Sequence, residues 1–282
     1  MSITTLSCNI RKSLPEDDEG GNGWEARKDL CFEVIRAQGA DVICLQECSN
    51  AQLTDVQRRL PEFESFGLAN PGELFNPTNL ILFSKARFDL ISAGGFWLSE
   101  TPHVAGSRSW DCAHPRFANW VQLRERDSGR ELRVWNTHFD HIGQLARERQ
   151  AQIVVEASTV FPDELPQLLT GDLNADATNA AVKRLTDAGW LDTYAAVHGP
   201  QDPGFTFHAF LGPDFPTQTP QHKIKGKIDW ILYRGPVWAL AAAIIRDGRN
   251  GRYPSDHYFV SAEVTLGRAA EQGNVGALDS RS

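Results

Sequence analysis

The sequence predicts an α/β protein, and three observations support this class. Short apolar runs typical of buried strands alternate with amphipathic patterns typical of helices in residues 1–60 and again in residues 165–190. Strand patterns dominate the centre of the chain. Several apolar runs end in an acid, an amide or an imidazole, and ligands of open α/β sheets bind beyond the carboxyl ends of strands. We therefore expect a site for chemistry at one edge of the predicted sheet.

The composition fits a globular protein with a large core. The chain has 282 residues, of which 41% are hydrophobic. We expect one domain over residues 1–266 and a flexible polar tail over residues 267–282. The formal charge of −8 and the isoelectric point of about 5.5 give no overall basic field, which argues against tight, sequence-blind binding to long nucleic acid.

The cysteines and the first residues of the chain bear on the cellular compartment that we expect for the protein. An odd number of cysteines, two of them inside predicted strands, favours reduced core thiols over a disulfide framework or a cysteine-ligated zinc site. The five are Cys8, Cys31, Cys44, Cys48 and Cys112. The first residues lack a basic region followed by an apolar region, and no apolar run reaches the length of a membrane span. We expect a cytoplasmic protein.

The first third of the chain predicts two strand and helix pairs. Residues 2–10 form the first predicted strand, which ends at Asn9, and a polar loop follows over residues 15–23. The pattern then predicts a helix over 24–37, a strand over 41–47, and a helix from a capping box at Ser49 to about Leu60.

The centre of the chain predicts mainly strands. They lie over residues 79–83 and 88–98, and a hairpin joins 117–124 to 131–138. Between them, residues 99–116 form a long irregular segment, and loops of this length in a compact domain are more often functional than idle.

The last part of the chain alternates again between predicted helices and strands. Helices are predicted over 143–160 and 177–188, and a loop-rich region with Phe205-Thr206-Phe207-His208 follows the second of them. Strands are predicted over 167–170, 227–233 and 258–264.

Two of the predicted strands deliver carboxylates at their ends. The strand over 167–170 runs into Gly171-Asp172-Leu173-Asn174, where an acid beside an amide suits the binding of a nucleophilic water or a metal. The alternative is an Asx turn that caps the next helix. Glu47 ends another apolar run. A carboxylate there either stabilises the N-terminus of the next helix through the helix dipole or binds a hard divalent cation.

A further motif supports a different chemistry. Trp135-Asn136-Thr137-His138-Phe139-Asp140-His141 resembles the H-x-H-x-D-H zinc signature of the metallo-β-lactamase superfamily, with Asn136 in place of the first histidine. This interpretation gives Glu47, Asp172 and Asn174 no role.

A single asparagine and five motifs, in order along the chain, carry a second resemblance. The chain has Asn9, Gln46-Glu47, Thr137-His138, Gly171-Asp172-Leu173-Asn174, Ile228-Asp229-Trp230 and Ser255-Asp256-His257. In this order they resemble the endonuclease/exonuclease/phosphatase superfamily of metal-dependent phosphoesterases related to DNase I, over residues 2–264. Phrases such as Ser109-Trp110-Asp111 resemble a bacterial branch of uncertain substrate. The resemblance implies a four-layer sandwich, in which two mixed β-sheets pack face to face with helices outside.

The resemblance also implies roles for particular residues. Glu47 and Asn9 bind Mg²⁺ or Mn²⁺, and Asp256 joins that shell through water. Asp172, near Asn174, orients or deprotonates the attacking water, and with an ordinary pKa of about 3.9 it is a weak base. Asp229 pairs with His257, raises its pKa and keeps it protonated for the phosphoryl group, which His138 also contacts. Substrate contacts are expected from Arg116, His208, Asp140 and His141.

We therefore expect a metal-dependent phosphoesterase that cleaves a phosphodiester or phosphomonoester by in-line attack of water. The acidic charge and the long 99–116 segment favour a small or short phosphoester over duplex DNA, although nuclease activity is common among the relatives. A monomer is expected. The alternatives are a zinc-dependent metallo-β-lactamase-like hydrolase and a catalytically silent binding protein on the same fold.

Overall fold

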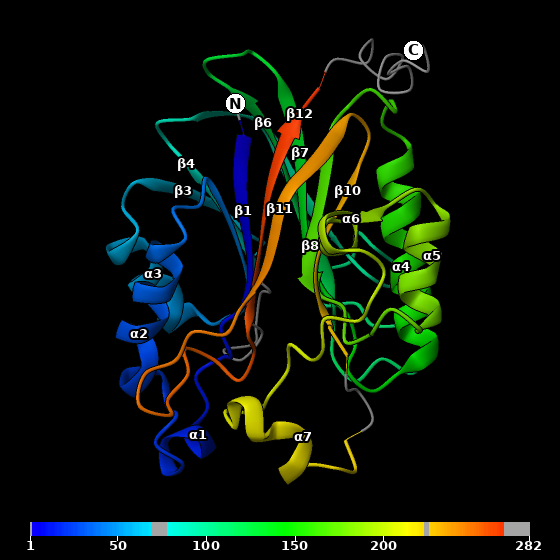
Figure 1. The fold of residues 1–282 in the computed structure, drawn as a ribbon. Helices are drawn as coiled ribbons and strands as arrows, with labels where there is room; N and C mark the ends of the chain where they lie inside the picture. Colours follow the sequence, from blue (N-terminus) through cyan, green and yellow to red (C-terminus); the bar gives the residue numbers. More distant parts are fainter. Residues whose placement is uncertain (1, 69–77, 223–225, 268–282) are drawn as a thin grey trace, which may run out of the picture.

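Two six-stranded β-sheets, each built mostly from antiparallel pairs, form the centre of the molecule (Figure 1). The computed structural model describes residues 2–68, 78–222 and 226–267. The first sheet has the order β11-β12-β1-β2-β4-β3. Its strands are β1 (Ser2–Asn9), β2 (Val42–Cys48), β3 (Phe63–Phe66), β4 (Thr78–Ser84), β11 (Val237–Ile245) and β12 (Phe259–Leu266).

The second sheet has the order β5-β6-β7-β8-β10-β9. Its strands are β5 (Phe88–Trp97), β6 (Phe117–Glu125), β7 (Glu131–His138), β8 (Gln167–Asp172), β9 (Leu191–Asp192) and β10 (Asp229–Arg234). Each sheet contains one parallel pair, β1 with β2 and β7 with β8, so both sheets are mixed.

Helices cover the outer face of each sheet. Figure 1 shows α2 and α3 beside the first sheet and α4 and α5 beside the second. The helices are α1 (Pro15–Glu19), α2 (Trp24–Ala37), α3 (Asn50–Arg59), α4 (Gln144–Thr159), α5 (Ala180–Asp187), α6 (Thr193–His198) and α7 (Phe215–Gln218), with a short 3-10 turn at Gly212–Asp214. The four layers of the predicted sandwich are confirmed.

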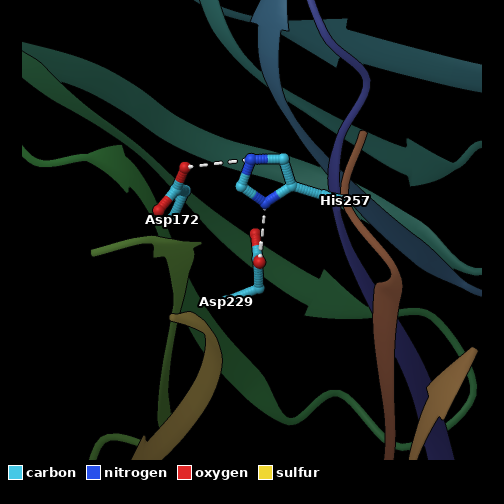
Figure 2. Close-up of side chains that lie close together, drawn as sticks. All are labelled: Asp172, Asp229 and His257. Carbon is cyan, nitrogen blue, oxygen red and sulfur yellow. Dashed lines mark hydrogen bonds and ion pairs between the residues drawn. The ribbon is translucent and has the colours of Figure 1, made fainter. Parts of the chain in front are cut away.

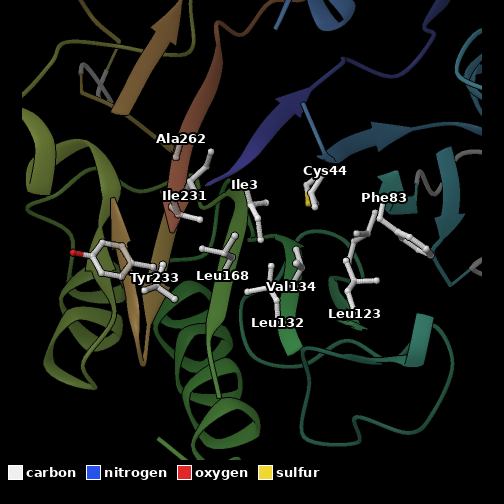
Figure 3. Close-up of a cluster of buried hydrophobic side chains, with 14 of the residues drawn as sticks. Ile3, Cys44, Phe83, Leu123, Leu132, Val134, Leu168, Ile231, Tyr233 and Ala262 are labelled. Carbon is white, nitrogen blue, oxygen red and sulfur yellow. The ribbon is translucent and has the colours of Figure 1, made fainter. Parts of the chain in front are cut away.

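Strand periodicity explains the packing, because alternate residues of a strand point to opposite faces. On β8, Leu168 points into the core between the sheets, whereas Leu169 packs with α4 and α5. Figure 3 shows the core between the sheets, where Ile3 and Phe83 of the first sheet meet Leu132 and Val134 of the second. All five cysteines are buried and free, which confirms the prediction of core thiols.

The strand register gathers polar residues at one edge. In the parallel pair β7 and β8, His138 lies opposite Asp172. In the antiparallel pair β8 and β10, Asp229 lies opposite the same Asp172. The end of the second sheet toward which the β8 arrow points in Figure 1 therefore carries His138, Asp172 and Asp229 on three neighbouring strands.

Buried carboxamides join the two sheets beneath this edge. Asn136 of β7 is fully buried, and its Nδ2 donates to the carbonyls of Leu45 (2.9 Å) and Leu80 (3.0 Å) on the first sheet. Its Oδ1 accepts a 2.7 Å hydrogen bond from Gln46 Nε2. A buried carboxamide with these partners fixes one sheet relative to the other.

The structure corrects several local predictions. The predicted polar loop over 15–23 contains α1, which has Pro15 in its first turn together with acids suited to a helix start. The helix predicted from residue 177 begins at Ala180, because the Asn179 side chain caps the Ala181 N–H. The loop-rich region contains α6, which Asp192 caps in the same way.

Other predictions hold or fall outside the described residues. The capping box at Ser49 is present. Of the predicted tail, residues 268–282 lie outside the described part of the chain, and the domain boundary stays a prediction. No helix in the described ranges has both the length and the apolar character to cross a bilayer. The monomer and the cytoplasmic location also stay predictions.

We predict that Asn136→Ala lowers the free energy of unfolding by about 2–4 kcal/mol, because the substitution leaves buried carbonyls and the Gln46 amide without partners. Urea unfolding measures the change. Asn50→Ala, at an exposed helix position, is the control and should stay within about 0.5 kcal/mol. An equally small change in Asn136→Ala would show that the carboxamide does not hold the sheets together.

Candidate active site

A cleft of about 570 Å³ opens where the strand ends of both sheets meet. The first sheet contributes Glu47 from β2, and the second contributes His138 and Asp172 from β7 and β8. Loops contribute Asn174, Asp256, Arg11, Lys12, Arg116 and His141. Most of the residues predicted for the site therefore share one cavity.

An imidazole, His257, lies between two carboxylates, Asp229 and Asp172, and of these three residues only Asp172 lines the cleft (Figure 2). His257 Nδ1 is 2.8 Å from Asp229 Oδ2, and His257 Nε2 is 3.8 Å from Asp172 Oδ2. Burial lowers the pKa of His257, but Asp229, Asp172 and Asp256 outweigh burial and raise the pKa to about 10. With this pKa the ring is an imidazolium at neutral pH. Its Nδ1 donates a hydrogen bond to Asp229, and its Nε2 forms a longer ion pair with Asp172.

The loop before β10 fixes this arrangement. Thr206 Oγ1 accepts hydrogen bonds from the backbone N–H groups of Ile228 (3.0 Å) and Asp229 (3.1 Å). Phe207 forms a β-bridge with His257, and its ring packs edge-on against the imidazole at a centroid distance of 5.1 Å. Thr206 and Phe207 thus hold the acid and the imidazole in register.

Asp172 has an unusual environment for a carboxylate. Burial and the charge of Asp229 raise its pKa to about 7, although His257, the Asn174 N–H and Asn9 favour the ionised form. The Asn174 N–H lies 2.9 Å from Oδ1, and Asn9 Nδ2 lies 3.0 Å from Oδ2. The expectation of an ordinary pKa was wrong, because neighbouring strands place Asp172 in a buried site beside a second acid.

Glu47 faces Asp172 across the cleft from the first sheet. A break in the pairing of β2 with β4 between Leu45 and Cys48 marks a bulge at this point. Burial raises the pKa of Glu47, but the Lys12 N–H, His257, Arg11 and Asn9 together hold it below its ordinary value. Asn9 Nδ2 also lies 3.2 Å from Glu47 Oε1, so one amide joins the acids of both sheets.

Backbone strain marks the same residues. Glu47 (φ 61°), Asn174 (φ 47°) and Arg11 (φ 52°) lie in the left-handed region, which side chains other than glycine rarely adopt. Such conformations cost of order 1–3 kcal/mol each and persist where the surroundings fix them. Their concentration around one cleft indicates a functional site.

Two groups of side chains are candidates for a divalent cation. Asp172, Asp229 and His257 offer ligand atoms within 4.8 Å of one another. However, His257 Nδ1 and Asp229 Oδ2 are hydrogen-bonded to each other at 2.8 Å, so these two atoms already have a partner. We therefore interpret this group as an imidazole held between two acids and not as a metal site.

The second group fits a cation better. Glu47 accepts only N–H groups, from Asn9 and Lys12, and no basic side chain of the described residues lies within 4.0 Å of its carboxylate. Asp256 lines the same cleft, and its Oδ2 lies 3.7 Å from Arg11 Nη1. Oxygen donors of this kind suit Mg²⁺ or Mn²⁺. Asn9 currently presents its amide nitrogen to both acids, so its carbonyl oxygen reaches a cation only after the amide rotates.

His138 and Asn174 contact each other at the cleft wall. Burial lowers the pKa of His138 well below its ordinary value, and the charges of Arg116 and His257 act in the same direction. The neutral ring can accept through Nε2 the hydrogen bond that Asn174 Nδ2 offers at 3.0 Å. Phosphate contact by His138 stays a prediction.

Two predicted substrate contacts are corrected. His208 is fully buried, accepts the Gly212 N–H at Nδ1 and packs on Tyr253 and Tyr258, so no substrate reaches it from the cleft. Asp140 is also fully buried. Its carboxylate accepts the backbone N–H groups of Ala113, Ile142 and Gly143, so it shapes the loop below the cleft.

Several cleft residues were missed from the sequence. Arg11, Lys12, Asn79 and His114 line the cavity. Phe207 of the predicted loop-rich region lines it as well. Arg11 and Lys12 follow the first strand end closely, and that position was the available signal. His114 stacks on His141 with centroids 5.7 Å apart, a contact that only the folded loops reveal.

Known proteins share this sequence pattern and architecture. The sequence model of the Endonuclease/Exonuclease/phosphatase family matches residues 6–257. A solved structure of a protein of that family from Bacteroides thetaiotaomicron is 29% identical, has a TM-score of 0.84, and covers 95% of this chain and 98% of its own. A mannosyl-6-phosphatase from the same organism is 29% identical, with a TM-score of 0.82 and coverage of 94% and 100%.

A curated relative is more distant. Nocturnin of Drosophila melanogaster is 24% identical over 283 residues, which cover 89% of this chain and 43% of nocturnin. This chain therefore spans less than half the length of that relative.

We predict that Asp229→Asn lowers the pKa of His257 toward the neutral range, because the carboxylate that stabilises the imidazolium is lost. NMR of the histidine ring in the metal-free protein should show His257 protonated at pH 8 in the wild type and titrating near neutrality in the variant. Asp187→Asn, at an exposed helix position, is the control.

The same shift predicts the pH dependence of stability. A histidine in the unfolded chain has a pKa of about 6.5. The His257 imidazolium therefore stabilises the folded protein fully below that pH, and this stabilisation is lost as the pH rises through about 10. The advantage of wild type over Asp229→Asn should therefore shrink from pH 6.5 to 10. A wild-type His257 that titrates near pH 6.5 would contradict both expectations.

Proposed function

The chain belongs to the endonuclease/exonuclease/phosphatase family, and we propose that it is a divalent-cation-dependent phosphoesterase that hydrolyses a small phosphate ester. One observation carries the proposal. A buried base, Asp172, lines one cleft together with Glu47, an acid without an ion-pair partner within 4.0 Å among the described residues, and the imidazolium of His257 lies behind Asp172 at 3.8 Å. Phosphoryl transfer needs a positioned nucleophile and positive charge for the phosphoryl oxygens, and this arrangement offers both.

Asp172 is the proposed base. With a pKa near 7 it has more affinity for a proton than an ordinary aspartate, which suits a general base at neutral pH. The N–H groups of Asn174 and Asn9 hold its two oxygens, so the carboxylate keeps one orientation while it accepts a proton from the attacking water.

His257 is the proposed donor to the phosphoryl group. Asp229 fixes Nδ1 and keeps the ring charged, while Nε2 points toward Asp172 and the cleft. As water adds and the alcohol departs, the phosphoryl oxygens gain negative charge, which an imidazolium N–H stabilises.

Glu47 and Asp256 are the proposed cation ligands, with Asn9 beside them. A Mg²⁺ or Mn²⁺ ion bound there would supply Lewis-acid stabilisation of the phosphoryl oxygens. The buried acids around the cleft exceed the basic groups that pair with them, and this excess is the charge that a cation would balance.

A sugar phosphate is the proposed substrate class. The relative named as a mannosyl-6-phosphatase matches this chain over 94% of its length. In the cleft, Arg116 Nη2 lies 3.3 Å from His141 Nδ1. When His141 Nδ1 accepts this hydrogen bond, His141 Nε2 carries the proton of the neutral ring. Arg116 and His141 then both offer N–H donors to the hydroxyl oxygens of a sugar. We propose Arg116 and His141 as contacts of the leaving group. The net charge of −8 favours this class over nucleic acid.

The zinc interpretation of residues 135–141 is wrong. Asn136 is bound to backbone carbonyls between the sheets, and Asp140 is fully buried under backbone N–H groups. The Asn136 amide is fully used by groups of the first sheet, and the Asp140 carboxylate is covered by backbone N–H groups, so neither offers a free ligand atom beside His138. A catalytically silent binding protein is the alternative that the first test below addresses.

We predict that Glu47→Gln lowers kcat on p-nitrophenyl phosphate or bis(p-nitrophenyl) phosphate by at least about a thousandfold. The variant lacks the carboxylate proposed to bind the cation, so the cation no longer stabilises the negative charge of the transition state. Chelation should abolish wild-type activity, and Mg²⁺ or Mn²⁺ should restore it. Glu16→Gln, at an exposed acid on the same cleft, should stay within about twofold. Wild-type turnover by Glu47→Gln would remove the assignment, and metal uptake without turnover on any phosphoester would favour the silent binding protein.

We predict that Arg116→Ala lowers kcat/KM on mannose 6-phosphate about 10- to 100-fold, since a substrate hydroxyl loses its hydrogen-bonding partner. Its effect on p-nitrophenyl phosphate, which has no hydroxyls, should be about threefold or less. Arg126→Ala, in the hairpin between β6 and β7, is the control. An equal loss on both substrates would place Arg116 at the phosphoryl group and contradict its proposed role.

A further inference from the structure

Arg27 of α2 is a buried cation, and its side chain donates hydrogen bonds to four backbone carbonyls of the described residues. Arg27 is only 3% exposed, and its guanidinium lies 5.0 Å from the centre of the Trp24 ring and 5.7 Å from the centre of the Phe210 ring. No carboxylate of the described residues forms an ion pair with it within 4.0 Å. Burying a charge in this way is costly, so an apolar side chain would serve better if packing were the only role.

The guanidinium joins three segments of the chain. Nε donates to Asn22 O (2.9 Å), before α2. Nη1 donates to Ile10 O (2.6 Å) and to Pro254 O (2.9 Å), and Nη2 donates to Arg11 O (2.6 Å). Ile10 and Arg11 follow β1, whereas Pro254 lies 227 positions further along the chain than Arg27. The planar fork of arginine is suited to holding several acceptors in fixed directions.

The first of these segments orients the acids of the first sheet. Arg11 has the strained φ of 52°, and its carbonyl is held by Arg27 and by Gln52 Nε2 (2.8 Å). In this turn the Arg11 N–H donates to Asn9 Oδ1 (3.0 Å) and the Lys12 N–H donates to Glu47 Oε2 (3.1 Å). The carbonyls that Arg27 binds therefore belong to the turn that positions Asn9 and Glu47.

The second segment leads to the opposite wall. Pro254 lies two residues before Asp256 and three before His257. Phe210, which packs on Arg27, belongs to the loop whose His208 and Ala209 N–H groups donate to Asp256 O (2.8 and 3.1 Å). One side chain outside the cleft thus contacts the supports of both walls.

We propose that Arg27 is a positioning residue that sets the distance between the cation-binding acids and the Asp256-His257 segment. This rests on the proposed function, although Arg27 touches neither substrate nor cation. Its loss releases the 10–12 turn and the 254–257 segment together, so the Glu47 carboxylate and Asp256 no longer face one cation.

The test uses Arg27→Met and, as a matched control, Arg133→Met in the full chain. Arg133 is also 3% exposed and packs on Trp120 and Phe161, but it lies on β7 at the end away from His138 and donates to Gln122. Both variants remove a buried guanidinium from between aromatic rings, so a general loss of packing affects both.

Three readouts separate positioning from stability. Mn²⁺ binding, followed by electron paramagnetic resonance at a temperature where each variant is folded, should weaken about 10- to 100-fold in Arg27→Met and about twofold or less in Arg133→Met. kcat/KM should fall in parallel. Hydrogen exchange should accelerate in peptides that cover residues 10–12 and 254–257 in Arg27→Met alone.

The outcomes are distinguishable from failure of the proposed function. Unchanged Mn²⁺ affinity and unchanged exchange at both segments in Arg27→Met would overturn the role of Arg27. If Arg27→Met does not fold, Arg27→Lys replaces it, and the point-like ammonium should still leave one segment released in hydrogen exchange. A wild type without phosphoesterase activity would refute the proposed function, while exchange still decides whether Arg27 joins the two segments.

Discussion

The site depends on how its buried negative charge is balanced. Glu47, Asp172, Asp229 and Asp256 meet at one end of the sandwich, and His257 is the cation placed among them. Taking a carboxylate out of water is expensive unless a partner compensates. The Asp229 to His257 hydrogen bond therefore determines much of the rest, because it fixes the ring and holds its proton. Burial and the charge of Asp229 raise the pKa of Asp172, and the charged His257 opposes them.

The two sheets make this arrangement rigid. The register of β8 with β7 and β10 sets His138 and Asp229 on either side of Asp172, and a register slip by one residue would turn these side chains to the other face. Across the sandwich, Asn9 joins Glu47 to Asp172, and Asn136 joins the sheets just below. The strained backbone at Glu47 and Asn174 persists because this framework holds it.

The four layers and the residue roles followed from the family resemblance of the ordered motifs, whereas local signals placed the main acids of the site at strand ends. Asp172 and Glu47 each end an apolar run, so strand periodicity alone placed them at a sheet edge. His208 and Asp140 were assigned wrongly because a motif does not show which way a side chain turns, and both point into the protein. Helix α1 was missed because acids and glycines dominate its surroundings. Arg27 gave no signal, since its partners are backbone carbonyls brought together only by folding.

The central claim is that the cation binds at Glu47, while His257 stays protonated and keeps its contacts with Asp229 and Asp172. A crystal of the protein soaked in Mn²⁺ tests it directly through the anomalous signal of the metal. The account predicts a peak within roughly 2.0–2.3 Å of a Glu47 carboxylate oxygen, with the His257 to Asp229 hydrogen bond intact. A peak coordinated by His257 together with Asp172 and Asp229, with none at Glu47, would contradict it.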